Sequence, residues 1–346
     1  MRGMNMTTSK ELVISALHRE EVDRIPFCPP FQGYWALGYS NVGTLQSIED
    51  PKAAAEAQFR VIDDCHIDGV ETMWDWLIPV EAMGCEVRIP QSGTIPTMEH
   101  IIHDANDLEK LAVPEFKDVK DFYRFAGARE TTRIMADRIG KDHYLMASLL
   151  APFTLAGELR GVEDMMMDCL MEEDFIHALV EKSAEIDTVF AEDIASWDID
   201  ALILCDPTCS GDLVCGDDYA KFSKAVTKKM GDMARSKGKD VITHICGDTT
   251  DRIGYVADTG AIAFSVDWQV DIGKAVKDME NRMAMIGNIN PAAYLFSGTP
   301  DQVREETRRI AESGGKKGFL MGSGCDIPVG SDYANVKAIS EILMNL

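Results

Sequence analysis

Residues 241–247 read Val-Ile-Thr-His-Ile-Cys-Gly, an apolar, strand-forming run that ends on a histidine, a cysteine and a glycine. An amphipathic stretch at 217–237 separates this run from an earlier apolar run at 201–205. Short buried strands that alternate with longer amphipathic helices are typical of parallel sheets. The local pattern therefore predicts a strand–helix–strand unit with polar side chains at the carboxyl end of its second strand.

The same alternation runs through the whole chain of 346 residues. Eight strands are predicted, at 25–29, 69–73, 144–149, 201–205, 241–246, 261–266, 283–287 and 318–322. Helices are predicted between them, including 51–65, 163–197, 217–237 and 300–313. Eight strand–helix units are typical of a closed (β/α)8 barrel of the TIM type, an α/β fold. We expect a single barrel domain over residues 1–346, because no repeat, low-complexity tract or interdomain linker interrupts the pattern.

Local signals support this interpretation. Thr8 with Glu11, and Thr299-Pro-Asp-Gln302, have the spacing of a capping box, in which two side chains satisfy backbone groups at the start of a helix. Residues 86–111 contain Gln91-Ser-Gly-Thr and predict a β-hairpin inserted between the second and third strands.

The composition excludes several classes of partner. The chain has 34 Lys and Arg residues against 58 Asp and Glu residues, a formal net charge of −24. A surface this acidic repels nucleic-acid phosphates and anionic lipids. We therefore expect neither nucleic acid nor membrane as a partner. No apolar run approaches the ~20 residues of a membrane span, and residues 1–8 contain no hydrophobic signal core. We expect a cytoplasmic protein whose nine cysteines are thiols or metal ligands.

Unusual polar residues fall at the carboxyl ends of the predicted strands, where barrels of this type carry their active sites. His244 and Cys246 end the fifth strand, and Cys325 follows the eighth in the stretch Phe-Leu-Met-Gly-Ser-Gly-Cys. Two thiolates and an imidazole suit zinc, and three protein ligands leave a fourth position open for chemistry. The sequence therefore predicts a catalytic zinc site at these three residues.

Other polar residues at the same ends have more than one interpretation. Asp206 follows the fourth strand, where it caps the next helix or contacts a substrate. Asp267 ends the sixth strand and is a fourth metal ligand, an acceptor that orients His244, or a helix cap. Asn288 follows the seventh strand, where it contacts a ligand or only tolerates the dihedral angles of a loop.

With these residues in place, the chain resembles the uroporphyrinogen decarboxylase superfamily, and within it the zinc-dependent corrinoid methyltransferases. The resemblance covers nearly the full length and is carried by Val22-Asp-Arg-Ile-Pro-Phe, Ala151-Pro-Phe-Thr-Leu-Ala, Asp206-Pro, His244-Ile-Cys-Gly, Val266-Asp-Trp, Gly322-Ser-Gly-Cys and residues 332–336. Decarboxylases of this superfamily carry an Arg-Gln-Ala-Gly-Arg type segment after the first strand, where this chain reads Pro29-Pro-Phe-Gln-Gly-Tyr-Trp-Ala. They also carry a histidine after the last strand, where this chain has Gly324-Cys325. Both departures favour methyl transfer over decarboxylation.

The resemblance implies a zinc-dependent methyltransferase that moves a methyl group between a corrinoid protein and a small-molecule thiol or methyl donor. Transfer of the methylcobamide:coenzyme M type and of the O-demethylase type are both compatible with it, and the direction of transfer is open. Cobalamin is expected on the separate corrinoid protein, because we identify no Asp-x-His-x-x-Gly segment with a cobalamin-binding role in this chain. Two alternatives are a metal-free uroporphyrinogen decarboxylase and a zinc-binding partner of a corrinoid protein that does not turn over.

In this scheme His244, Cys246 and Cys325 hold zinc, Asp206 and Asp267 take part in catalysis, and Asn288 and Trp268 contact the cofactor. Five aromatic residues are also expected near the mouth of the barrel, where they stack on an aromatic substrate or a corrin ring, or pack as a rim: Phe31, Tyr34, Trp35, Trp74 and Trp76.

Overall fold

The central element is a curled sheet of seven parallel strands in the order β1-β4-β5-β6-β7-β8-β9, seen in a computed structural model that describes residues 7–346. The strands are β1 (Gly69–Met73), β4 (Tyr144–Leu150), β5 (Ala201–Cys205), β6 (Asp240–Ile245), β7 (Ala263–Val266), β8 (Ala284–Ile289) and β9 (Phe319–Ser323). Nearly every residue in them is buried, as expected for a parallel sheet covered by helices. All seven were predicted, each to within two residues of its bounds.

The first predicted strand, at 25–29, is an irregular segment rather than a strand. Phe27 forms a single parallel bridge with Met321 of β9, and the Cys28 N–H donates to the Met321 carbonyl at 2.7 Å. On its other side, the Asp68 N–H, just before β1, donates to the Phe27 carbonyl at 2.8 Å. Prolines within and after the segment lack N–H donors and prevent a longer ladder. The segment therefore joins the two edge strands through a few hydrogen bonds.

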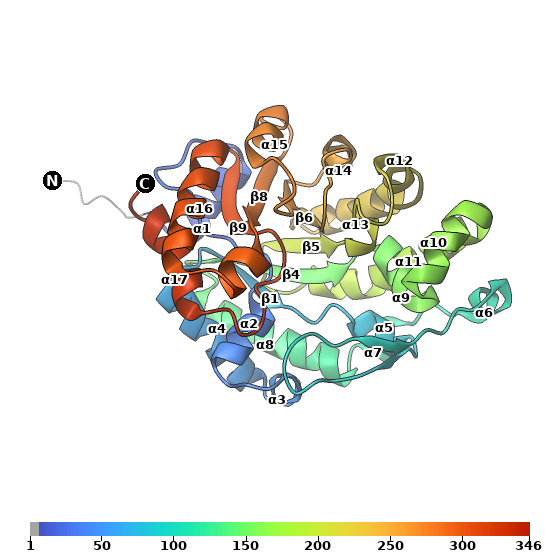
Figure 1. The fold of residues 1–346 in the computed structure, drawn as a ribbon. Coiled ribbons are helices and arrows are strands. Elements are labelled where there is room, and N and C mark those ends of the chain that lie inside the picture. The colour runs from blue at the N-terminus through green and yellow to red at the C-terminus, as the bar shows by residue number, and fades with distance from the viewer. Residues whose placement is uncertain (1–6) are drawn as a thin grey trace.

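Helices cover the outside of the sheet (Figure 1). In the first half of the chain they are α1 (Ser9–Leu17), α2 (Gly33–Tyr39), α3 (Thr44–Glu49), α4 (Pro51–Cys65), α5 (Ile78–Ala82), α6 (Ala105–Lys110), α7 (Phe116–Val119), α8 (Tyr123–Ile139), α9 (Pro152–Arg160), α10 (Val162–Met171) and α11 (Glu173–Ile194). The second half has η1 (Pro207–Cys209), α12 (Gly216–Asp218), η2 (Tyr219–Ser223), α13 (Lys224–Ser236), α14 (Ile253–Asp258), α15 (Ile272–Asp278), η3 (Pro291–Phe296), α16 (Pro300–Gly314) and α17 (Tyr333–Leu343).

Two long predicted helices are interrupted. The stretch 163–197 divides into α10 and α11 at Glu172, whose dihedral angles of −134° and 54° are not helical. The stretch 217–237 contains the π-helical segment η2 between α12 and α13. The predicted capping boxes are confirmed: the Thr8 and Thr299 side chains each accept from the backbone N–H three residues on, and each N3 side chain accepts in return.

A small antiparallel sheet, β2 (Glu86–Val87) and β3 (Thr97–Glu99), lies between β1 and β4 in chain order. One continuous cluster of buried apolar side chains joins the strands to the outer helices. Among residues 7–346, no helix is both long and apolar enough to span a bilayer. The expectation about a signal segment falls partly on residues 1–6, outside the described part of the chain.

Candidate metal centre

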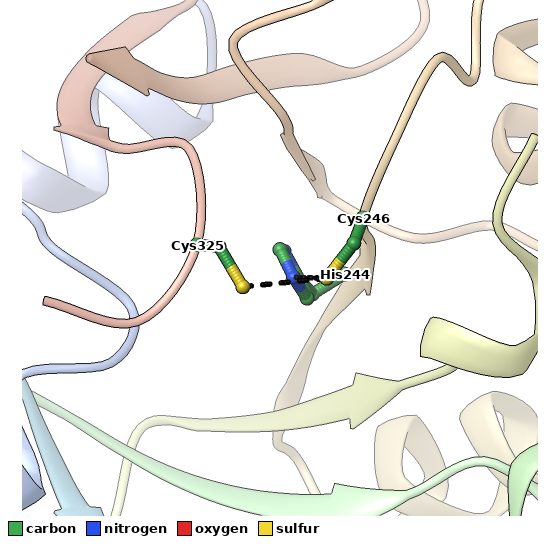
Figure 2. A group of neighbouring side chains, drawn as sticks. All are labelled: His244, Cys246 and Cys325. Atoms are coloured by element: carbon green, nitrogen blue, oxygen red, sulfur yellow. Dashed lines mark hydrogen bonds between the residues drawn. The ribbon is translucent and has the colours of Figure 1, made fainter. Parts of the chain in front are cut away.

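Three potential metal ligands converge at the carboxyl end of the sheet. His244 lies on β6, Cys246 follows that strand directly, and Cys325 lies in the loop after β9 (Figure 2). His244 Nε2 is 3.2 Å from Cys246 Sγ, and Cys246 Sγ is 3.3 Å from Cys325 Sγ. All three ligand atoms lie within 4.8 Å of one another. Ligands about 2.3 Å from a tetrahedral zinc ion are roughly 3.8 Å apart, so this donor set fits one ion.

Two glycines make the convergence possible. Gly247 follows Cys246 with a φ of +74°, and a Cβ atom there would lie 2.3 Å from Ser210 Oγ. Gly324 precedes Cys325, and a Cβ atom there would lie 2.7 Å from the backbone nitrogen of Trp268. Only glycine permits both the positive φ and these close approaches. The loops after β6 and β9 can therefore carry their cysteines toward one point.

The histidine ring is held by a neighbour that the sequence did not suggest. His244 Nδ1 lies 3.0 Å from Ser265 Oγ, and the two residues are paired in register on β6 and β7. A proton on Nδ1 that is donated to Ser265 leaves Nε2 free to bind a metal. The Phe31 ring packs edge-on against the imidazole at a centroid distance of 4.5 Å. The side chain of His244 is only 1 % exposed.

The sulfur atoms of the two cysteines form a hydrogen bond that shifts the pKa values of both thiols. The hydrogen bond with Cys246 lowers the pKa of the Cys325 thiol well below its ordinary value, because it stabilises the Cys325 thiolate. The same hydrogen bond raises the pKa of Cys246 well above its ordinary value. One sulfur is therefore a ready anionic ligand, and a cation at the site favours loss of the remaining proton.

Asp267 lies directly after β7, beside this group. Its side chain is 7 % exposed, and its Oδ1 atom is buried without a hydrogen-bond partner among the described residues. Burial raises the pKa of this carboxyl. Other residues fill two of the three roles that the sequence predicted for Asp267. Ser265 is the partner of His244 Nδ1, and Asp271 caps the following helix, α15. An unpartnered carboxylate oxygen next to a metal-ligand set is the kind of atom that a cation satisfies.

The two residues assigned to cofactor contact differ in exposure. Asn288, on β8, is 4 % exposed, and its amide donates to the carbonyls of Asp267 and Val270 at 2.9 and 2.8 Å. The structure therefore places Asn288 as a brace for the loop that carries Asp267. Trp268 is 51 % exposed, beside the Gly324 backbone, and presents a free aromatic surface at the mouth.

Asp206, the other residue assigned to catalysis, is fully buried after β5. Its oxygens accept hydrogen bonds from the Thr154 hydroxyl at 2.8 Å and the Ser223 hydroxyl at 2.6 Å. Burial raises the pKa of the Asp206 carboxyl, although these hydrogen bonds oppose the rise. These contacts tie the start of α9 to η2 and are not with the histidine and cysteines.

One further buried carboxylate, that of Glu71, was not identified from the sequence. Glu71 lies within β1 and is fully buried; its Oε1 atom accepts from Ser148 Oγ at 2.7 Å and from Trp76 Nε1 at 3.4 Å. Oε2 is buried without a partner among the described residues. Burial raises the pKa of Glu71 well above its ordinary value. A glutamate inside an otherwise buried strand was the signal that could have identified it.

The five aromatic residues predicted near the mouth of the barrel lie in different environments. Phe31 lies between His244 and Trp76, with a centroid distance of 4.9 Å to the latter. Tyr34 and Trp74 belong to a small separate apolar cluster and line a cavity together with Trp76. Trp35 is instead buried in the core, with its indole N–H donating to the Ser331 carbonyl at 3.0 Å.

One stretch corrects the sequence interpretation. Residues 64–69 read Asp-Cys-His-Ile-Asp-Gly and contain the Asp-x-His-x-x-Gly spacing that was not expected in this chain. His66 ends α4 in a left-handed conformation, and Gly69 is the first residue of β1. The segment therefore lies at the amino end of the strands, opposite the end that carries the histidine and cysteines. Asp68 within it is paired with Arg24 at 2.7 Å.

A comparison with known families agrees with this architecture. The sequence profile described as Uroporphyrinogen decarboxylase (URO-D) matches residues 8–345, nearly the whole chain. The chain belongs to the uroporphyrinogen decarboxylase family. This membership accounts for the curled parallel sheet and for polar residues at its carboxyl end.

Within the uroporphyrinogen decarboxylase family, similar curated proteins include methyltransferases and decarboxylases. The methylcobamide:CoM methyltransferase MtbA of Methanosarcina mazei is 27 % identical over 99 % of both chains. MtaA of Methanosarcina barkeri is 24 % identical over 97 % of both chains. The uroporphyrinogen decarboxylase of Chlorobium limicola is 26 % identical over 96 % of this chain and 97 % of its own length. A solved structure titled methyltransferase from Methanosarcina mazei superposes with a TM-score of 0.88 at 22 % identity, over 98 % of this chain and 99 % of its own. The curated methyltransferases among these relatives match nearly the whole chain and support an enzyme that transfers methyl groups.

Proposed function

We propose that this chain is a zinc-dependent methyltransferase that moves a methyl group between a corrinoid on a separate protein and a small-molecule thiol or methyl donor. The observation that carries the proposal is the convergence of His244, Cys246 and Cys325 within 4.8 Å at the carboxyl end of the sheet. The names of the relatives, methylcobamide:CoM methyltransferases, support the reaction type.

The three ligands define the charge of the centre. Two thiolates balance the two positive charges of zinc, and a neutral His244 adds none, so the loaded site is formally neutral. Zinc bound there supplies a Lewis acid that lowers the pKa of a substrate thiol or polarises the atom that carries a methyl group. Ser265 holds the orientation of the His244 ring, and Phe31 packs against that ring.

In the acceptor direction, the substrate thiol loses its proton to solvent and its thiolate attacks the methyl group of methylcobalamin. The sulfur–carbon bond forms as the cobalt–carbon bond breaks, and the electron pair of the broken bond stays on cobalt. The protein contributes the position and orientation of the thiolate. The opposite direction, with a methylated oxygen or sulfur compound as donor, uses the same three ligands.

The remaining site residues take the following roles in this proposal. Asp267 is a fourth, displaceable ligand, supported by its unpartnered Oδ1 atom. Trp268 meets the corrinoid protein, supported by its exposure at the mouth. Asn288 acts indirectly, through the loop carbonyls that it holds. Asp206 is a positioning residue that acts through its hydrogen bonds with Thr154 and Ser223.

The fold supports one catalytic domain over residues 1–346. We interpret the segment 25–29 as the reduced first strand of a (β/α)8 barrel, because it is hydrogen-bonded to both edge strands. We interpret β2 and β3 as a hairpin inserted between the second and third barrel strands.

Decarboxylation of a porphyrinogen is the weaker alternative. A porphyrinogen with many carboxylates needs cationic side chains, whereas the segment 29–36 has none, and Gln32 within it is buried against the Glu71 backbone. A zinc-binding scaffold without turnover is the second alternative.

A direct experiment separates these three functions. The purified chain, with its zinc content measured, is mixed with free methylcobalamin and a panel of thiols, and loss of the cobalt–carbon bond is followed by absorbance. Our proposal expects about one zinc per chain, no bound cobalamin, methyl transfer that requires zinc, and faster transfer when a corrinoid protein is supplied. Activity on uroporphyrinogen in metal-free protein would favour decarboxylation, and zinc binding without any methyl transfer would favour the scaffold.

A further inference from the structure

A cavity of about 200 Å³ opens at the carboxyl end of the sheet, separated from His244 by the ring of Phe31. Trp74 follows β1, Leu150 ends β4 and Pro207 follows β5, so the cavity lies at the strand ends that also carry the histidine and cysteines. Phe31 connects the two regions, because its ring packs against both His244 and the cavity residue Trp76. The cavity is therefore a candidate site for the non-reacting end of a small molecule whose reacting atom reaches the metal.

The cavity walls are aromatic and apolar on several sides. Tyr34, Trp74 and Trp76 supply three aromatic rings, and apolar side chains supply much of the rest. Aromatic faces attract cations through the negative charge density of their π systems, and tryptophan does so best. An anion receives no such attraction from the ring faces.

The charged groups of the cavity are acidic. Its titratable lining residues are Asp75, Glu158 and Tyr34, and the described lining contains no lysine, arginine or histidine. Asp75 is held by Arg124, but the same guanidinium also binds Glu81, so this group of three carries one net negative charge. Glu158 accepts a hydrogen bond from Thr97 Oγ1 at 2.5 Å, which leaves its charge uncompensated.

A half-buried carboxylate without an ion-pair partner, beside aromatic rings, attracts a cation and repels an anion. We propose that the small-molecule substrate of this chain carries an ammonium group at its non-reacting end, bound between Glu158 and the aromatic side chains of Trp74 and Trp76. This inference rests on the proposed methyltransferase function. It differs from what the names of the related proteins suggest, because coenzyme M carries a sulfonate, which is an anion. The acidic lining repels that anion.

Three thiols with one carbon skeleton test the inference. 2-Aminoethanethiol, 2-mercaptoethanol and 2-mercaptoethanesulfonate differ only in the end group, which is cationic, neutral and anionic respectively. With the zinc-loaded protein and methylcobalamin, the ammonium thiol should have the lowest KM, at least about tenfold below that of the sulfonate, and the difference should shrink as salt screens the charges. Any other order of KM overturns the proposal.

A binding measurement separates this inference from the proposed reaction. The S-methyl derivatives of the three thiols are titrated into the zinc-loaded protein by calorimetry, which requires no turnover. Tightest binding of the ammonium compound supports the inference, whereas tighter binding of the sulfonate, or no binding of the ammonium compound, overturns it. If no thiol is methylated while the ammonium compound still binds best, the proposed function fails and the charge preference stands.

A matched pair of variants locates the effect. Glu158→Gln removes one charge from the cavity and keeps an acceptor for Thr97, so the preference for ammonium over sulfonate should fall by roughly tenfold. Glu312→Gln makes the same change on the exposed outer face of α16 and should leave the preference unaltered. An unchanged preference in Glu158→Gln, with a normal melting temperature, would show that Glu158 does not bind the ammonium group.

Discussion

Ser265 Oγ lies 3.0 Å from His244 Nδ1, across two neighbouring strands in register. This contact holds the orientation of the histidine ring, and it belongs to the rigid sheet rather than to a loop. Hydrogen-bond partners of the outer ring nitrogen of metal-binding histidines are worth about 10–100-fold in metal affinity or activity. The neighbouring strand therefore contributes to the candidate metal centre.

Replacing Ser265 by alanine should weaken zinc binding by about 10–100-fold while the fold is kept, because the ring loses its acceptor but not its packing. Zinc affinity is measured by competition with a chelator, and the fold by circular dichroism. Ser265→Thr retains the hydroxyl and should retain most of the affinity. Ser183→Ala removes another buried hydroxyl, on α11, and serves as the control. Equal zinc affinity in Ser265→Ala and Ser183→Ala would contradict the role given to Ser265.

Replacing Cys246 or Cys325 by alanine should abolish stoichiometric zinc binding, because two remaining ligands hold zinc poorly. Both sulfurs lie in loops at the carboxyl end, so the melting temperature of the metal-free protein should change little. Cys215, which is exposed and lies in a loop after β5, provides the matched control in Cys215→Ala. Full zinc content and full activity in Cys325→Ala would mean that the ligand set is wrong.

Replacing Asp267 by asparagine keeps the size of the side chain and removes its charge. If Asp267 is a displaceable ligand, zinc affinity or turnover should fall by about tenfold or more. The N-cap of α15 is Asp271, so Asp271→Asn is a fair control for effects on the helix, and it should alter neither property. The role of Asp267 at the metal would be refuted by wild-type turnover and zinc affinity in Asp267→Asn.

The grouping of His244, Cys246 and Cys325 could be predicted from the sequence, because it follows from the strand order of a parallel sheet. In a parallel sheet all carboxyl ends lie on one side, so polar residues after β6 and β9 lie at the same end of the sheet, and the closed barrel that was predicted brings them toward one another. Ser265 could not be found in this way, because its role depends on which β7 residue lies opposite His244. The absence of a regular strand at 25–29 and the interruption of 163–197 at Glu172 also depend on backbone hydrogen bonds that hydrophobic patterns do not report.

Buried carboxylates were equally hidden from the sequence. Asp187 on α11 looks like one more acidic residue of a helix, yet it is fully buried, and both of its oxygens lack partners among the described residues. Burial, with a smaller contribution from Asp206, raises its pKa well above the ordinary value. Folding therefore favours the protonated form of this carboxyl.

The sign of this effect gives a pH-dependent prediction. Below about pH 4 the Asp187 carboxyl is protonated in both the folded and the unfolded chain, so it contributes no pH dependence. Above that pH the unfolded chain releases the proton while the folded protein retains it, so the free energy of unfolding falls as the pH rises toward the folded-state pKa. Asp187→Asn mimics the protonated acid at every pH. It should therefore raise the melting temperature at pH 7, and the gain should disappear toward pH 4.

The measurement is a series of thermal melts of both proteins between pH 4 and pH 8. Glu181→Gln, an exposed change from acid to amide on the same helix, controls for the loss of one negative charge from a strongly acidic chain. General charge relief would raise the melting temperature of both variants alike, whereas burial of Asp187 predicts a larger gain in Asp187→Asn that grows with pH. A gain in Asp187→Asn that is independent of pH would mean that Asp187 is ionised in the folded protein, with a cation or water that offsets its charge.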